Sequence, residues 1–187
     1  MKKVEICPSN ESLLLWLYKK PGQGWIFGNM YEIPQGYYGL KVPRDEHDDF
    51  DIDPGNRGKV KRRSALYIVR LLPFEPLGWG IGSLPCVTVD GDMATVGVNG
   101  TFCFSVELPR MLYETTTDIG NNVSMESFRR RIVTLMGNEI INSFKPTTVK
   151  RLNAVSQAIH SCRSNIDIIF SSFGTKLESL TVDGITQ

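Results

Sequence analysis

The spacing of apolar residues changes along this chain, and this change restricts the folds open to it. Up to residue 107, aromatic and β-branched residues form short runs between proline, glycine and charged residues, which is typical of strands. Beyond residue 107, apolar residues recur every three or four positions, which is typical of amphipathic helices. One more strand-like run follows at residues 175–185. The order predicts an α+β fold, a mostly antiparallel sheet with helices packed on one face.

The first part of the chain is expected to contain several strands. Residues 30–42 predict two strands around a Pro-Gln-Gly turn, and residues 43–63 predict a loop, acidic first and basic afterwards. Residues 64–72 are almost entirely apolar, as in a strand buried on both faces. The run at residues 86–89 is predicted to form a hairpin with residues 93–107.

Three glycines, Gly78, Gly80 and Gly82, surround Trp79 just before this hairpin. A phosphate-binding loop is one interpretation, but no GxGxxG pattern opens a helix here. A hairpin follows the glycines, so no helix N-terminus is expected to face an anion. We therefore predict a structural bend in which Trp79 is a buried peg.

Three helices are expected in the second part. A short one begins at Pro109, and a longer one follows Ser124, a suitable N-cap. The apolar face of the longer helix is predicted to consist of Phe128, Ile132, Leu135, Met136, Ile140 and Phe144. A third helix is predicted over residues 148–173, with Cys162 on its apolar stripe and Gly174 as its stop.

The length of 187 residues suffices for one domain with its own core, predicted at residues 21–187 behind an N-terminal segment of residues 1–20. The 21 basic and 20 acidic side chains leave a net charge of +1, so no overall field favours nucleic acid or membrane. The four cysteines form no CxxC pair, and no secretory signal is recognisable. A reduced, cytoplasmic setting is therefore expected.

The N-terminal segment contains an apolar run that is too short to span a membrane. Its residues are Leu13, Leu14, Leu15, Trp16 and Leu17, and Lys19 and Lys20 follow. One interpretation is an edge strand or short helix docked on the core of its own domain. The other is a contact with a partner or with the surface of an anionic membrane, made together with the two lysines.

Candidate metal ligands are few. Asp49, Asp51 and Asp53 alternate as in a calcium loop, but the twelfth position of that loop is Val60 rather than glutamate. A solvated loop is the better interpretation. His47, His160 and Cys162 suggest a zinc or thiol site only weakly, and Cys162 is expected to be a buried small side chain. We expect no cofactor and no metal.

Two basic clusters are candidates for binding anions. The first consists of Arg57, Lys59, Lys61, Arg62 and Arg63, and the second of Arg129, Arg130 and Arg131. No aromatic residue interleaves with either cluster, so base stacking is not indicated. An anionic lipid or an acidic protein is favoured over nucleic acid as the partner.

The segment from Gly78 to Leu112 resembles the centre of the SPFH superfamily (stomatin, prohibitin and flotillin proteins, also called band 7). It is most similar to the soluble branch called virion core protein-like. The features that carry the resemblance are Trp79-Gly80, Asp90, Gly100-Thr101-Phe102-Cys103-Phe104 and Pro109. "YEIPQGYYGLKV" resembles the opening hairpin of that family, and the helix, Gly174 and strand after residue 153 resemble its closing unit.

The resemblance implies a non-enzymatic scaffold that organises a membrane- or envelope-associated protein complex. Its partners would be other proteins, further copies of itself and the anionic inner face of a membrane, with no small-molecule substrate. Two alternatives remain open. One is a phosphate- or RNA-binding module, and the other is a small metal-dependent enzyme that uses the acidic loop.

Overall fold

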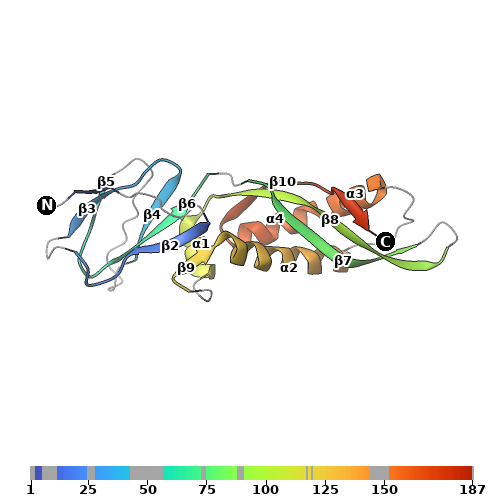
Figure 1. The fold of residues 1–187 in the computed structure, drawn as a ribbon, viewed down its shortest axis with the longest axis horizontal. Coiled ribbons are helices and arrows are strands. Elements are labelled where there is room, and N and C mark those ends of the chain that lie inside the picture. Colours follow the sequence, from blue (N-terminus) through green and yellow to red (C-terminus); the bar gives the residue numbers. More distant parts are fainter. Residues whose placement is uncertain are drawn as a thin grey trace. The chain divides into compact units, whose positions relative to one another are not determined.

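The computed structural model describes residues 3–5, 12–24, 28–42, 57–72, 75–87, 91–116, 118, 120–143 and 152–186. Its contacts divide the chain into two compact units, Met1–Leu72 with Val106–Phe128 and Pro73–Ser105 with Arg129–Gln187. The fold is α+β with mostly antiparallel sheets, as the apolar pattern predicts (Figure 1). The predicted boundary at residue 20 does not coincide with this division, because β2 (Leu13–Lys19) is an interior strand of the first unit.

The first unit contains two sheets that pack on each other. The smaller sheet has the order β1-β3-β5, with β1 at Lys3–Glu5, β3 at Asn29–Glu32 and β5 at Arg57–Val60. The larger has the order β4-β6-β2-β9, with β4 at Tyr37–Val42, β6 at Ala65–Arg70 and β9 at Asn122–Ser124. Tyr31 and Val60 of the smaller sheet share a buried cluster with Leu66 and Ile68 of the larger one. Burial of these side chains from both sheets holds the first unit together.

The two strands predicted around the Pro-Gln-Gly turn are confirmed as β3 and β4. They do not form the hairpin that the family resemblance implies, because β3 pairs with β5 whereas β4 pairs with β6 in the other sheet. The chain passes from one sheet to the other at Gly36, which has a φ of 82°. The basic end of the predicted loop is strand β5, whose exposed and buried residues alternate because it lies at the edge of a packed sheet. Residues 43–56 lie outside the described part of the chain. The prediction of a strand buried on both faces is confirmed for Ala65–Val69, whereas Arg70 is half-buried and Leu72 is exposed.

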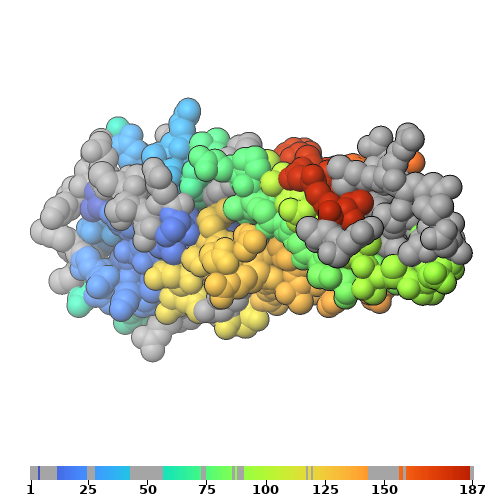
Figure 2. Space-filling model, turned by 45° about the vertical axis from the view of Figure 1, so that its right-hand side comes forward, coloured from blue at the N-terminus to red at the C-terminus, as the bar shows by residue number. Residues whose placement is uncertain are grey.

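The second unit is built around one long strand. This strand, β8 (Met93–Val106), pairs with β7 (Leu77–Val87), with β10 (Thr175–Leu180) and with β11 (Gly184–Thr186). The predicted hairpin is confirmed but begins at Leu77, so the three glycines lie within a paired strand and the predicted bend is wrong. An irregularity between Ile81 and Leu84 is the only departure from regular pairing that β7 shows. Figure 2 shows the C-terminal residues on the surface beside the residues of β7 and β8.

Helices cover the sheet of the second unit. α2 (Met125–Ser143) contacts β7 where Gly137 meets Ile81, and α4 (Arg163–Ser172) packs Phe170 against Phe102 at 5.6 Å between ring centroids. The predicted N-cap is confirmed, since the Ser124 hydroxyl accepts a hydrogen bond from the Ser127 amide at 3.1 Å. The buried face of α2 comprises Phe128, Ile132, Met136 and Ile140. Leu135 is exposed, contrary to prediction, and Phe144 lies outside the described residues.

The predicted third helix is two helices. α3 (Leu152–Ser161) and α4 are separated at Cys162, whose ψ of 2° departs from helical geometry. The Cys162 amide bonds to the carbonyl of Ile159, three residues back, which tightens the turn and interrupts the α-helical pattern. Gly174, with a φ of 68°, ends α4 as predicted. The predicted closing strand is also divided, into β10 and β11.

Candidate functional site

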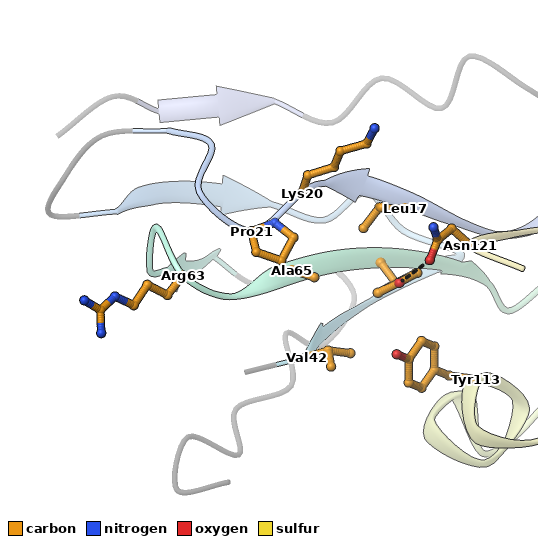
Figure 3. A pocket seen from close by; sticks show the side chains of 9 residues that line it. Leu17, Lys20, Pro21, Val42, Arg63, Ala65, Tyr113 and Asn121 are labelled. Carbon is orange, nitrogen blue, oxygen red and sulfur yellow. Dashed lines mark hydrogen bonds between the residues drawn. The ribbon is translucent and has the colours of Figure 1, made fainter. Parts of the chain in front are cut away.

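The first unit contains an open pocket of about 650 Å³ on one face of its four-stranded sheet (Figure 3). Trp16, Leu66 and Ile68 point from this sheet into the core between the sheets. Because successive side chains of a strand alternate, the neighbouring Leu17 and Tyr67 face the other way, toward the pocket. The apolar part of the lining consists of Leu17, Pro21, Val42 and Ala65. Its polar part consists of Lys20, Arg63, Tyr67, Tyr113 and Asn121.

A pair of tyrosines and an amide form one wall of the pocket. Helix α1 (Pro109–Thr116) brings Tyr113 to Tyr67, with ring centroids 4.8 Å apart and tilted by 57°. The Tyr67 hydroxyl, on a side chain that is only 6% exposed, lies 3.0 Å from Asn121 Oδ1 and donates to it. Burial, assisted by the charge of Tyr113 and its hydrogen bond, raises the pKa of Tyr67 to about 12. Tyr67 therefore remains a neutral donor at physiological pH.

The mouth of the pocket is basic because two turns meet there. The Gly22 amide donates to the Arg62 carbonyl at 2.7 Å, and Arg62 Nε donates to the Gly22 carbonyl at 3.0 Å. Lys20, which precedes one turn, and Arg63, in the other, both line the pocket. Both side chains are exposed, and the structure shows no ion-pair partner for either among the residues it describes. Among the described residues, the pocket lining contains no carboxylate.

Lys19 joins the same two turns from inside. Its ammonium is buried and lies 3.1 Å from the carbonyl oxygens of Lys61 and Arg62 and 2.5 Å from that of Ser64. Desolvation by burial lowers the pKa of Lys19. The ammonium donates to several carbonyls at once, so it fixes the shape of the turn that carries Arg63. Lys19 is therefore structural, not a surface contact as one interpretation of the sequence had it.

We call the exposed side chains of Lys20, Lys59, Lys61, Arg62 and Arg63 the basic tip. Two segments that are distant in sequence contribute to it, and both were predicted as candidate contact residues. Arg57, the first residue of the predicted cluster, forms an ion pair with Glu32 at 3.1 Å and does not belong to the tip.

The apolar run at the N-terminus is packed inside the first unit. Leu14 and Leu15 are fully buried, while Leu13, Trp16 and Leu17 are partly buried. Trp16 packs edge-on against Tyr37, with ring centroids 5.9 Å apart. Of the two interpretations, docking on its own core accounts for this burial, although β2 is an interior strand and not an edge strand.

The second unit confirms part of the Trp79 prediction. Trp79 is 4% exposed, as expected of a peg, but its Nε1 donates to the Thr181 carbonyl at 3.1 Å. It therefore holds the turn between β10 and β11 over β8. A Cβ on Gly100 would collide with this carbonyl, so glycine is required there.

Two arginines of the predicted triplet, Arg129 and Arg131, make contacts within the second unit. Arg129 Nε donates to the Gly78 carbonyl at 2.7 Å, and the guanidinium of Arg131 lies 5.1 Å from the centre of the Phe173 ring. These interactions connect α2 to β7 and to the end of α4.

The remaining candidates do not form a site in the described part of the chain. No group of three or more His, Cys, Asp or Glu residues that could hold a metal ion is found there. Cys162 is a buried thiol, as predicted, and His160 is exposed in α3. His47, Asp49, Asp51 and Asp53, which make up the predicted acidic candidate, lie outside the described residues, as does Asp90.

The sequence did not indicate Tyr67, Tyr113 and Asn121 as site residues. They come from a strand, a helix and a connection that no motif links, and only the topology of the first unit brings them together.

Comparison with models of known protein families finds no match, and a search of curated proteins finds none either. Among the described residues, no helix has the length and apolar character needed to cross a membrane.

Proposed function

We propose that this chain is a non-enzymatic scaffold of the SPFH type, which organises a protein complex at the cytoplasmic face of an anionic membrane. In this proposal the basic tip contacts lipid headgroups, and other proteins, including further copies of the chain, bind to the remaining surface. The protein would be peripheral, held by charge and not by insertion.

The observation that carries the proposal is the gathering of five exposed cations at two adjoining turns and on the strand β5 that leads into one of them. A lysine or arginine close to an anionic membrane surface contributes about 1 kcal/mol of binding free energy. Five such residues supply at most about 5 kcal/mol, which corresponds to weak, reversible binding that salt disrupts. The apolar run at Leu13–Lys19 is occupied in the sheet, which leaves electrostatic attraction as the means of contact.

The arrangement of the motifs supports the SPFH type. Trp79-Gly80 lies in β7, Gly100-Thr101-Phe102-Cys103-Phe104 lies in the paired strand β8, and Pro109 begins α1. Gly174 separates the last helix from β10. The segment Gly100–Phe104 and Pro109 lie in a strand and a helix as the resemblance implies, whereas Trp79-Gly80 was expected in a bend and lies in a strand.

Co-sedimentation with lipid vesicles tests the proposal. The chain is expected to pellet with vesicles that contain phosphatidylserine, to remain in solution with pure phosphatidylcholine vesicles, and to be released by added salt. Lys59→Glu combined with Lys61→Glu should abolish pelleting. The matched control, Arg110→Glu with Lys176→Glu, makes the same change of charge at exposed positions outside the tip and should leave pelleting intact.

Three outcomes would contradict the proposal. They are equal binding to neutral vesicles, equal loss of binding in the two double variants, and tighter binding to an RNA homopolymer than to anionic vesicles. The last outcome would favour the nucleic-acid alternative.

A further inference from the structure

We infer that the pocket between Leu17, Tyr67 and Tyr113 binds a small organic anion whose negatively charged head is attached to an apolar body. The pocket shares Lys20 and Arg63 with the basic tip, but the inference does not rest on the proposed membrane contact. A carboxylate, sulfonate or phosphate ester would each supply the head.

The size and floor of the pocket suit an apolar body. Its volume of about 650 Å³ falls within the range of about 300–1,000 Å³ that is typical of small-molecule sites. Leu17, Val42 and Ala65 present only carbon atoms from their side chains, and Pro21 closes one side. Water in contact with this floor forms few hydrogen bonds, so its displacement by an apolar group is favourable.

The wall of the pocket supplies an oriented polar group. Because Tyr67 donates to Asn121 Oδ1, the amide of Asn121 is held with its oxygen toward the tyrosine (Figure 3). Its nitrogen has no acceptor among the described residues and can donate to a ligand. Tyr67 is more than nine-tenths buried whereas Asn121 is exposed, so the tyrosine holds the amide oxygen while the amide nitrogen stays accessible to a ligand.

The positive charge at the mouth of the pocket favours a ligand whose head group is negatively charged. Lys20 and Arg63 are the only charged residues in the described lining, and both are cations. Figure 3 shows the two side chains extending in different directions, so both charges reach one head only after the side chains rotate. The head would then lie at the mouth while the body covers the floor. Both side chains are long and exposed, and rotation about their bonds brings the charges to the head without movement of the backbone.

Two fluorescent probes with the same apolar skeleton test this inference on the full chain. Anilinonaphthalene sulfonate carries a sulfonate, and phenylnaphthylamine is its uncharged counterpart. We expect saturable binding of both probes, with the sulfonate bound more tightly. Lys20→Gln with Arg63→Gln should weaken the sulfonate on the order of tenfold, as expected for the loss of charge-assisted hydrogen bonds, and leave the neutral probe unchanged.

A matched control distinguishes binding by the pocket residues from general attraction by the positive charge of the basic tip. Lys59→Gln with Lys61→Gln removes the same charge from the basic tip but from residues outside the pocket lining. This control should retain sulfonate affinity within about twofold, the residual effect expected of more distant, screened charges. Equal weakening in both double variants would show that the field, not the pocket, attracts the probe, and would overturn the inference.

Further variants identify the floor and the wall. Val42→Trp should weaken both probes because it fills the pocket, and circular dichroism checks that it folds. Asn121→Ala changes an exposed residue and should weaken the sulfonate alone. Octanoate should displace the sulfonate and inorganic phosphate should not. Displacement by phosphate alone, or no effect of any of these variants, would refute the requirement for an apolar body beside an anionic head.

Discussion

Trp79 offers the sharpest test of how the second unit is held together. Its indole is buried, and its Nε1 bonds to the Thr181 carbonyl, on the turn that crosses β8 at Gly100. This turn also depends on two backbone bonds, from the amide of Thr181 to Thr101 at 2.8 Å and from that of Asp183 to Asn99 at 2.9 Å. Loss of the indole should therefore release the C-terminal strand β11 before the rest of the unit.

The magnitude follows from two contributions. Trp79→Ala removes a large buried side chain and leaves a cavity, which costs about 3–5 kcal/mol of unfolding free energy. Trp79→Phe retains most of the apolar volume but removes the Nε1 donor, and the unpaired carbonyl then costs about 1–3 kcal/mol. The two variants together separate packing from hydrogen bonding.

Urea unfolding combined with amide hydrogen exchange measures both effects. Trp79→Phe should lower the protection of the Thr181 and Asp183 amides more than that of the β6 amides in the first unit. If Trp79→Ala left the unfolding free energy unchanged while binding of a partner was lost, Trp79 would belong to an interface and this reasoning would be refuted. Uniform loss of protection across the chain would refute the local role of the indole.

Three further predictions concern other positions. Lys19→Met should cost about 1–3 kcal/mol in urea unfolding, because several carbonyl oxygens lose their donor; an unchanged midpoint would contradict this. The folded state holds the Tyr67 proton more tightly than the unfolded state, so stability should fall as pH rises from about 10 to about 12. Tyr67→Phe should remove this loss, and persistence of the full loss in the variant would contradict the assignment. Light scattering on the isolated chain should give a monomer or small oligomer, since the apolar stripe of α4 is buried at Ile166 and Phe170; a large ring would contradict this.

Local patterns predicted the elements better than their pairing. The three-four spacing correctly gave α2, its N-cap at Ser124 and the stop at Gly174. It did not predict the break at Cys162, because apolar residues continue in helical spacing across it and the change lies in one backbone angle. The spacing of apolar residues indicates which side of a segment is buried, and one tight turn within the segment does not change this spacing.

Pairing was predicted less well because it depends on distant residues. The segment at 30–42 has the composition of a hairpin, yet its two strands belong to opposite sheets. Two nearby strands pair only if no distant strand offers a better apolar match, and β5 and β6 provide that match here. The apolar run at residues 13–17 was similarly ambiguous, since a short apolar segment has the same residue pattern whether its own domain or a partner covers it.

The pocket exists because helix α1 is shorter than the strands it lies against, and no motif in the sequence indicates this difference. α1 has eight residues and is about 12 Å long, whereas a strand of six residues such as β6 extends about 20 Å. One short helix therefore covers only part of the sheet face. The chain places Tyr113 where the helix meets the strand and the small Ala65 two residues before Tyr67, in the uncovered part. In the described part of the chain this leaves an apolar surface open beside two cations that have no ion-pair partner there. Water alone satisfies such a surface poorly, and an amphipathic anion complements both of its parts.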